Sequence, residues 1–379
     1  MTSSRSDWCH LAWPLRDMRA HPALCPRLIV CGSHLAPEFG HTVDVIEEDG
    51  FVVDARVDYP LDTDTEATMA RSVGHATLAF ADLLESRPPD LLLASADRHE
   101  MLAPAIAAVT LRIPIAHLEG GEWTAGAIDN VVRHALTMMA HVHFTPTERA
   151  TRRVVAMGEE AWRVHRVGAP SLDHLHRGKL LDPAQLADRL RMPLDPAPLV
   201  AAVHPVTLFD DPAGAEGAAL LAALGRRTEP IVFCLPNADA RGRALAGKVR
   251  TFCDGRANAR LFENLDPLTY WSLLRHAVAL VGNSSSGLME TPAVRLPAVN
   301  VGRRQEGRER AANVVDAPAD PDAIGAALDR ITRPAFVQSL HGLHNPYGDG
   351  HAGERLAEIL AALPSRRELL LKQDTLGTI

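Results

Sequence analysis

The feature that most constrains the fold of this chain is a repeated alternation of short apolar runs with longer amphipathic stretches. Short apolar runs suit strands that are covered on both faces, whereas helices need longer stretches. Strands that alternate with helices form βαβ units and therefore parallel sheets. Two series of strands are predicted: Leu28–Cys31, Phe51–Val57, Leu91–Ala94, Ile113–His117, Val142–Thr145 and Val164–Val167, followed by Leu199–Val203, Ile231–Leu235, Arg260–Phe262, Ala279–Val281, Ala298–Val301 and Val314–Val315.

A proline-rich stretch separates the two series and predicts a linker with one short helix, Pro183–Leu190. The predicted fold class is α/β, with two doubly wound Rossmann-like domains that face each other across a cleft. The segment after Leu363 is expected to be a loose end, that is, a tail that is not held on the folded domains. Further helices are predicted at Ala67–Ser86, Met101–Thr110, Asn130–Met139, Glu148–Met157, Ala213–Leu224 and Ser286–Ala293. The expected divisions are a first Rossmann-like domain at 1–170, a linker at 171–197, a second Rossmann-like domain at 198–345 and a C-terminal helix and tail at 346–379.

Composition restricts the partners of the chain. Its 379 residues are 46% hydrophobic and carry a net charge of −8, which fits a globular protein and disfavours nucleic acid as a partner. A few amides and arginines still suffice to bind one anionic small molecule. Five scattered cysteines without a Cys-x-x-Cys pair indicate reduced thiols in a cytoplasmic protein. The N-terminus is polar and interrupted by Pro14, and no long apolar run exists, so neither a signal peptide nor a membrane span is expected.

The chain begins with what looks like a ligand-binding loop, Thr2–Trp8. A doubly wound domain usually opens with an apolar strand whose first turn carries such a loop. That strand is missing here. We therefore expect either that the natural chain starts upstream or that the first sheet is weakened.

Three carboxylates form the first candidate site. Asp97 and Glu119 follow consecutive predicted strands, and Asp129 lies at the start of a predicted helix. The carboxyl ends of parallel strands meet at one sheet edge, where clustered carboxylates can act as acid and base. Structural alternatives are that Asp129 is an N-cap, that Asp97 caps a helix at Glu100–Thr110, and that the nearby Glu122 is a solvated loop charge.

A Gly/Ser turn between a strand and a helix forms the second candidate site. Unpaired amides at a helix N-terminus and hydroxyl donors suit a phosphate, and an acidic side chain one turn later suits ribose hydroxyls. An ordinary capped helix explains the same pattern. The residues are Gly282, Asn283, Ser284, Ser285, Ser286 and Glu290.

Basic groups and histidines add to the candidate chemistry. Four arginines follow one strand, and either hold a diphosphate or lie on a solvated loop: Arg303, Arg304, Arg308 and Arg310. His204 ends the first strand of the second domain, where it can polarise a phosphate or transfer a proton, or serve only as a strand-end residue. His141 and His143 alternate on one strand, but no third ligand is visible, so no metal site is predicted.

Together these motifs resemble the hydrolysing UDP-N-acetylglucosamine 2-epimerases of sialic-acid and nonulosonate biosynthesis. The resemblance implies the two-domain GT-B fold of glycogen-phosphorylase-type glycosyltransferases, a nucleotide-sugar substrate in the cleft, no metal or other cofactor, and a dimer or tetramer. It covers residues 2 to about 362, in the stretches HLAPEFGHTVDVIEEDGF, ADRHE, IPIAHLEGGEWTAGAIDNVVRHALTMMAHVHF, VGAPSLD, HPVT, VGNSSSGLMETP, VNVGRRQEGRERAANV and NPYGDGHAGERLAEIL.

The resemblance also implies roles for single residues. Asp97, Glu119 and Asp129 match the family's acid/base carboxylates, and His204 matches its His-Pro-Val-Thr histidine. Ser284, Ser285 and Glu290 match positions that hold the diphosphate and ribose, and Arg5 matches the arginine of the first loop. Two positions depart from the pattern: Thr-Ser-Ser-Arg replaces Thr-Gly-Thr-Arg, and Ala96 replaces a glycine.

The function expected from the resemblance is conversion of UDP-N-acetylglucosamine and water to N-acetylmannosamine and UDP. A glycosyltransferase of the same fold is the main alternative, and it needs no base for the C2 proton. A nucleotide-sugar-binding regulator without catalysis is another. Relatives with this pattern also act on UDP-linked diacetamido-trideoxyhexoses or GDP-linked N-acetylglucosamine, and the sequence does not choose among these sugars.

Overall fold

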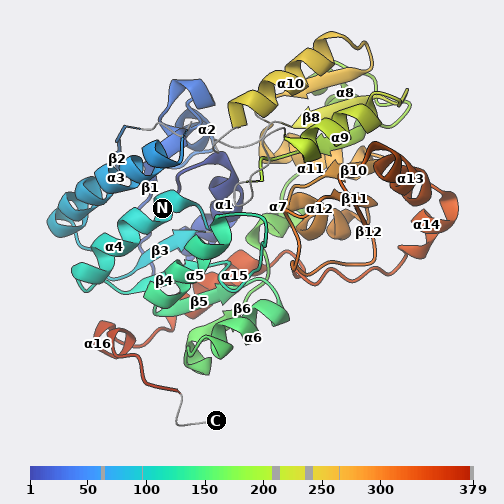
Figure 1. The fold of residues 1–379 in the computed structure, drawn as a ribbon. Coiled ribbons are helices and arrows are strands. Elements are labelled where there is room, and N and C mark those ends of the chain that lie inside the picture. The colour runs from blue at the N-terminus through green and yellow to red at the C-terminus, as the bar shows by residue number, and fades with distance from the viewer. Residues whose placement is uncertain (61–64, 96, 207–213, 235–241, 264, 376–379) are drawn as a thin grey trace. The chain divides into compact units, whose positions relative to one another are not determined.

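A computed structural model describes residues 1–60, 65–95, 97–206, 214–234, 242–263 and 265–375 (Figure 1). Ala96, Thr207, Ala213 and Leu235, which belong to motifs or elements expected from the sequence, lie outside these ranges. The chain divides into two compact units. Unit 1 comprises Met1–Glu122, Ile128–Asp173 and Tyr347–Ile379, and unit 2 comprises Trp123–Ala127 and His174–Pro346.

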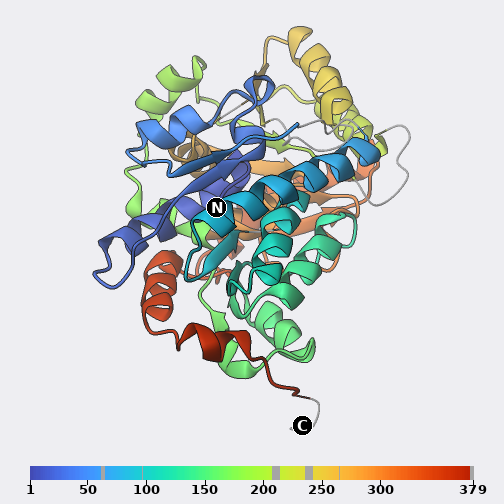
Figure 2. The same ribbon diagram turned by 90° about the vertical axis from the view of Figure 1, so that its left-hand side faces the viewer.

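Unit 1 is built on parallel strands in two groups, a pair β1-β2 and a sheet in the order β3-β4-β5-β6. Helices α3 and α4 lie side by side on one face (Figures 1 and 2) and pack with α5 around the buried Phe80. Helices α1 and α15 cover the other face, where Trp8 and Leu356 are buried. The bounds are α1 Arg5–Ala20, β1 Ile29–Cys31, α2 Val43–Glu48, β2 Ala55–Val57, α3 Glu66–Ser86, β3 Leu92–Ser95, α4 Leu102–Thr110, β4 Ile115–Leu118, α5 Asp129–Met139, β5 Val142–Thr145, α6 Glu148–Ala156, β6 Val164–Arg166, α15 Ala352–Ala361 and α16 Arg366–Leu370.

The first two residues lie between β1 and β3. Thr2 forms an isolated parallel bridge with Val30. Its backbone amide donates a hydrogen bond to Ile29 O at 3.0 Å, and its carbonyl accepts one from Cys31 N at 3.1 Å. On the other side, the Met1 ammonium donates to Leu93 O at 3.1 Å. These two residues therefore satisfy backbone groups of both neighbouring strands.

The expectation of a loop through Trp8 is wrong, because α1 begins at Arg5. Ser4 caps the helix by accepting a hydrogen bond from the Asp7 amide at 3.4 Å. Burial of Trp8 and Leu11 against the core stabilises the helix, although Pro14 lies inside it.

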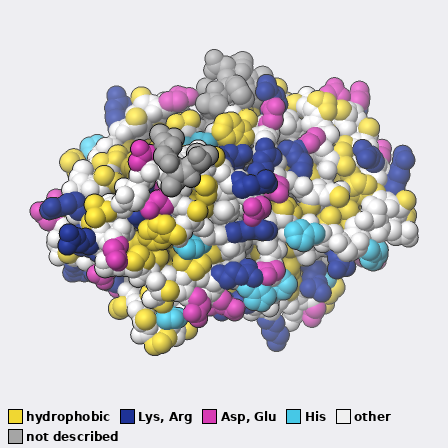
Figure 3. Space-filling view, turned by 90° about the horizontal axis from the view of Figure 1, so that it is seen from below, with side chains coloured by type: hydrophobic (Ala, Val, Ile, Leu, Met, Phe, Trp, Pro, Cys, Tyr) yellow, Lys and Arg dark blue, Asp and Glu magenta, His cyan; other side chains and the backbone are white. Residues whose placement is uncertain are grey.

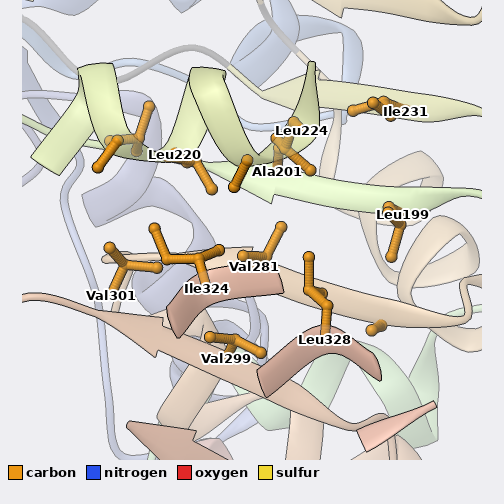
Figure 4. Packing of buried hydrophobic residues seen from close by; sticks show 14 of the residues in the cluster. Leu199, Ala201, Leu220, Leu224, Ile231, Val281, Val299, Val301, Ile324 and Leu328 are labelled. Carbon is orange, nitrogen blue, oxygen red and sulfur yellow. The ribbon is translucent and has the colours of Figure 1, made fainter. Parts of the chain in front are cut away.

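Unit 2 contains one six-stranded parallel sheet in the order β12-β11-β10-β7-β8-β9. Alternate strand residues such as Leu199 and Val281 meet Leu220 and Ile324 of two helices on one face (Figure 4). The bounds are α7 Asp173–Arg177, which starts at the unit boundary, then α8 Pro183–Leu190, β7 Leu199–Ala202, α9 Ala215–Leu224, β8 Ile231–Cys234, α10 Gly242–Asp254, β9 Ala259–Phe262, α11 Pro267–His276, β10 Ala279–Gly282, α12 Ser286–Met289, β11 Ala298–Val301, β12 Val314–Ala317, α13 Pro321–Ile331 and α14 Pro334–Ser339.

The predicted fold class is confirmed as α/β with parallel sheets in two units. Each predicted strand is present, and Val142–Thr145 and Ala298–Val301 have the predicted bounds. The largest difference is β2, which starts at Ala55 because Phe51 instead packs edge-on against Trp8, with ring centroids 4.7 Å apart.

The expectation of a loose end after Leu363 is wrong for residues 366–373. The buried Arg163 guanidinium donates to Leu369 O at 2.9 Å and to Leu371 O at 2.8 Å. Lys372 Nζ lies 2.5 Å from Glu159 Oε1 and donates to Ala140 O at 2.8 Å. Because buried carbonyls and carboxylates need partners, these contacts hold the segment on unit 1.

The surface is of mixed charge where Figure 3 displays it, with basic side chains lying among acidic ones. Among the described helices, none combines the length and the apolar character that a membrane crossing requires.

Candidate functional site

The carboxylates of unit 1 follow the ends of its central strands. Asp97 lies two residues beyond β3, and Glu119 directly follows β4. Asp129 is the first residue of α5, one turn before Arg133. The buried Arg133 guanidinium binds Asp97 Oδ2 and donates to Glu122 O at 3.1 Å. Helix α5 is therefore tied to both strand-end segments through one cation.

The structural alternatives for these carboxylates are wrong. Ile128, not Asp129, occupies the N-cap position of α5. Met101 occupies that position in α4, so Asp97 does not cap it. Glu122 is buried rather than solvated, and its Oε2 accepts a hydrogen bond from Tyr347 Oη at 3.1 Å.

Glu119 has a backbone conformation that is rare for a residue with a side chain, with φ = 64°. Its amide donates to Phe144 O at 2.7 Å, which fixes the backbone at the end of β4. Gly121 follows at φ = 82°, where a Cβ would lie 2.4 Å from Ala150 O. Close packing therefore imposes this turn, and Glu119 Oε1 lies 3.1 Å from His10 Nδ1 of α1.

Sequence reasoning missed His10 and a buried polar group near the start of α1. His10 lies in the segment whose beginning was interpreted as a loop, so no helix geometry pointed to it. Asp7 accepts hydrogen bonds from Ser3 N and Oγ at 3.1 and 2.7 Å, and burial raises the pKa of its carboxyl. Arg5 is the first residue of the same helix and is half-buried.

A buried ion pair follows Asp97 directly. Burial alone raises the pKa of Glu100, but Arg98 and His99 more than offset this and hold it below its ordinary value. Arg98 donates to Glu100 Oε1 at 3.1 Å, and both side chains are buried. Because this buried pair directly follows Asp97 in the chain, it helps to fix the segment that carries Asp97.

In unit 2, the loops after β7 and β10 are joined through Asn283. Its Oδ1 accepts from His204 N at 2.7 Å, and its Nδ2 donates to His204 O at 2.9 Å and to Glu216 Oε2 at 2.8 Å. Gly282, at φ = 144°, is required because a Cβ there would overlap Ala202 O. Asn283 is fully buried and therefore fixes the backbone of His204.

The predicted helix Ser286–Ala293 is wrong in its length. Helix α12 ends at Met289, and a 3₁₀ turn spans Thr291–Val294. Pro292 disfavours a continuous α-helix through the residue before it. Within this segment, Ser286 Oγ lies 2.6 Å from Tyr270 Oη and binds the Glu290 carboxylate, whereas Ser284 and Ser285 are half-buried.

The four arginines after β11 contact protein groups. Arg303 binds Glu306 at 2.8 Å, and Arg304 donates to Asn283 O at 3.1 Å. The remaining contacts join Arg308 to Met289 Sδ at 3.4 Å and Arg310 to Asp316. The loop is thus braced against the residue that follows β10 and against β12.

His141 and His143 have structural partners. His141 Nδ1 accepts from Ile115 N at 3.1 Å, and His143 Nε2 lies 3.0 Å from Glu159 Oε2. Burial lowers the pKa of both imidazoles, that of His141 to about 4. Within the described ranges, no group of three His, Cys, Asp or Glu side chains has an arrangement that would hold a metal ion.

Solved structures show the class of fold that these two parallel sheets define. A UDP-GlcNAc 2-epimerase from Neisseria meningitidis, solved with UDP-GlcNAc bound, superposes with a TM-score of 0.82 at 17% identity, over 95% of this chain and 98% of that one. The Methanocaldococcus jannaschii UDP-GlcNAc 2-epimerase, solved with UDP-GlcNAc and UDP, superposes with a TM-score of 0.78 at 16% identity. The superposition covers 95% of this chain and 98% of that one. The fold is therefore that of the GT-B-like UDP-GlcNAc 2-epimerases.

Sequence comparison identifies the family. The family model described as UDP-N-acetylglucosamine 2-epimerase matches residues 16–361, and the chain belongs to this family. It is 32% identical to the UDP-N,N'-diacetylbacillosamine 2-epimerase (hydrolyzing) of Legionella pneumophila, over 98% of this chain and 97% of that protein. It is 27% identical to the UDP-N-acetylglucosamine 2-epimerase of Neisseria meningitidis, over 87% and 86%. The resemblance seen in the sequence is confirmed, and the chain is an enzyme of the UDP-N-acetylglucosamine 2-epimerase type.

Proposed function

We propose that the protein is a hydrolysing 2-epimerase that converts UDP-N-acetylglucosamine, or a closely related nucleotide sugar, and water to the 2-epimeric free sugar and UDP. With UDP-N-acetylglucosamine the free sugar is N-acetylmannosamine. The observation that carries the proposal is the placement of Asp97, Glu119 and Asp129 at strand ends and a helix start of one unit, with Asp97 bound by Arg133. A glycosyltransferase of the same fold has no need of a base for the C2 proton.

The proposed reaction begins with elimination. The C2 proton is weakly acidic, so its loss is coupled to departure of the diphosphate, which gives a 2-acetamidoglucal without a full carbanion. Water then adds across the double bond, with the hydroxyl at C1 and a proton at C2 on the opposite face. We assign Asp97 as the base, and Glu119 and Asp129 as the groups that donate a proton or activate water.

The nucleotide is assigned to unit 2. Gly282–Glu290 carries the Ser284 and Ser285 hydroxyls for phosphate and the Glu290 carboxylate for ribose hydroxyls. His204, whose backbone is held by Asn283, is assigned to the leaving phosphate. Arg5 is assigned to phosphate binding, as the resemblance to the family implies. No metal or other cofactor enters the proposed reaction.

A second candidate sugar is UDP-N,N'-diacetylbacillosamine. Two relatives that are 32% identical to this chain carry that sugar in their names, and the one from Campylobacter jejuni is named for GDP- and UDP-linked forms. A third relative, at 29% identity, is named instead for polysialic acid biosynthesis, as protein P7 of Escherichia coli. A cytoplasmic location belongs to the same proposal, because the five cysteines are scattered along the sequence without a Cys-x-x-Cys pair.

The experiment is incubation of the protein in heavy water with each of three nucleotide sugars: UDP-N-acetylglucosamine, UDP-N,N'-diacetylbacillosamine and GDP-linked N-acetylglucosamine. The proposal expects a free 2-epimeric sugar with one deuterium at C2, together with the nucleoside diphosphate. Product that keeps its original C2 hydrogen would exclude elimination and favour simple glycosyl transfer. The sugar turned over with the highest kcat/KM identifies the substrate.

A further inference from the structure

Helix α1 places an imidazole against one of the proposed acid/base carboxylates. His10 Nδ1 lies 3.1 Å from Glu119 Oε1, and the two side chains are 17% and 10% exposed. This separation is that of a close charge contact, although the two atoms do not have the angular geometry of a hydrogen bond. Little water reaches the pair, so the interaction is weakly screened.

The backbone of Glu119 has an uncommon conformation at the position that contacts His10. With φ = 64°, the residue occupies a left-handed conformation that is unfavourable for a residue with a side chain. Such conformations persist where the surroundings over-determine them, and they concentrate at functional sites. Here the bond from the Glu119 amide to Phe144 O and the tight packing of Gly121 hold the turn, and the side chain reaches α1.

His10 is not needed to hold α1 in place. The helix is anchored by Trp8, Leu11 and Leu15, which are each no more than 3% exposed. Its first turn is fixed separately by the hydrogen bonds from Ser3 to Asp7. The packing and the first turn of α1 thus rest on contacts other than the one between His10 and Glu119.

We infer that His10 is a positioning residue for Glu119. It holds Oε1 of the carboxylate and leaves Oε2 as the oxygen that exchanges a proton with the substrate. His10 itself neither gains nor loses a covalent bond, and acts only through the orientation and charge of Glu119. This inference rests on the proposed function, in which Glu119 is one of the acid/base groups.

The kinetic test uses H10Q and H10A with the nucleotide sugar that the wild-type enzyme turns over. Orienting partners of catalytic groups typically contribute one to two orders of magnitude, so kcat is expected to fall about 10- to 100-fold while KM changes less than about threefold. The matched control is H41N, which removes the imidazole of an exposed His–Asp pair in the same unit and is expected to leave kcat unchanged. Unchanged kcat in both His10 variants would overturn the inference.

Chemical rescue separates positioning from packing. Added imidazole is expected to restore part of the kcat of H10A, whereas pyrrole, which has a similar shape but no basic nitrogen, is expected to restore none. Equal rescue by the two compounds would mean that His10 only fills space and would overturn the inference. Melting temperatures of the variants establish that they are folded.

A third measurement does not depend on turnover. In protein made with isotope-labelled histidine, the ring-nitrogen signals of His10 are those lost in H10Q, and E119Q is expected to shift them. No shift would overturn the contact itself. If E119Q shifts the signals but the wild type turns over none of the nucleotide sugars, the proposed function fails and the His10–Glu119 pair stands.

Discussion

The side-chain amide of Asn283 makes the two hydrogen bonds with His204 that a neighbouring strand would make: Oδ1 accepts from His204 N at 2.7 Å, and Nδ2 donates to His204 O at 2.9 Å. Asn283 follows β10, and His204 lies just beyond the adjacent strand β7. The Asn283–His204 hydrogen bonds thus continue the link between β10 and β7 beyond the ends of the two strands. A residue proposed to serve the leaving phosphate is thus positioned through its backbone.

Replacement of Asn283 by Ala should disturb His204 and unit 2 together. The substitution removes three hydrogen bonds from a buried side chain, so the free energy of unfolding is expected to fall by about 1–3 kcal/mol. At a temperature where the variant is folded, kcat/KM for the nucleotide sugar is expected to fall by about tenfold or more. Chemical denaturation and steady-state kinetics check both effects. Wild-type kcat/KM in a destabilised N283A variant would mean that the backbone of His204 does not contribute to the reaction.

Arg133 and Asp97 should act as a unit. D97N is expected to lower kcat by about 10²-fold or more, as for the loss of a general base. R133M removes the cation that binds Asp97 and is expected to lower kcat by about 10- to 100-fold. Because the residues are in contact, the double variant is expected to be no worse than D97N by more than about threefold. Multiplicative losses in the double-mutant cycle would contradict a shared role.

Substitution of Glu119 by Asn should separate stability from activity. Asn tolerates the left-handed region better than Glu does. The free energy of unfolding of E119N is therefore expected to equal that of the wild type or to exceed it by up to about 1 kcal/mol. Loss of the carboxylate is expected to lower kcat by about 10²-fold or more. A large loss of stability in denaturant titrations would show that the carboxylate, rather than the turn, holds this segment.

Lowering the pH should reduce the free energy of unfolding, because the buried His34 resists protonation in the folded protein. Its Nδ1 and Nε2 lie 2.7 and 2.9 Å from the hydroxyls of Thr42 and Thr2, and burial lowers the pKa of the imidazole to about 3. Between pH 6.5 and 3 the unfolded chain binds a proton that the folded protein does not, so the free energy of unfolding falls as pH falls, by about 1.4 kcal/mol per unit. Above about pH 6.5 this contribution is constant.

The measurement for His34 is a series of urea titrations between about pH 4.5 and 7.5. H34Q is expected to show a shallower decrease toward low pH than the wild type, since it has no proton to bind. The exposed-histidine variant H41N serves as control and should follow the wild type. Parallel curves for H34Q and the wild type would show that His34 does not cause the acid sensitivity.

Removal of the Arg163 guanidinium should release the C-terminal segment. R163M leaves the carbonyls of Leu369 and Leu371 and the Glu160 carboxylate without this donor, and is expected to lower the free energy of unfolding by about 2–4 kcal/mol. The control is R152M, which removes an exposed ion pair with Glu148 and should change stability by less than about 0.5 kcal/mol. Limited proteolysis should cut R163M after Leu363 faster than the wild type. Equal cleavage rates would mean that other contacts hold the segment.

The sequence by itself determined the strands and about half of the helices. A parallel strand covered on both faces needs a continuous apolar run, and such runs are visible without knowledge of the neighbours, as at Val142–Thr145 and Ala298–Val301. The positions of Asp97 and Glu119 beyond strand ends follow from the same pattern. Where local signals conflicted, the prediction failed: the polar residues and Pro14 hid α1, and Pro292 ended the helix that began at Ser286.

The tertiary structure alone decided which groups meet. His10 and Glu119, Asn283 and His204, and Arg163 and Leu371 are pairs that come from different elements, and each contact depends on how those elements pack. The left-handed turn at Glu119 is likewise imposed by Ala150 and Phe144, which no local pattern connects to it. The physical reason is that burial and hydrogen bonding between distant segments are set by the packing of the whole unit, whereas periodicity reports only which face of each element is covered.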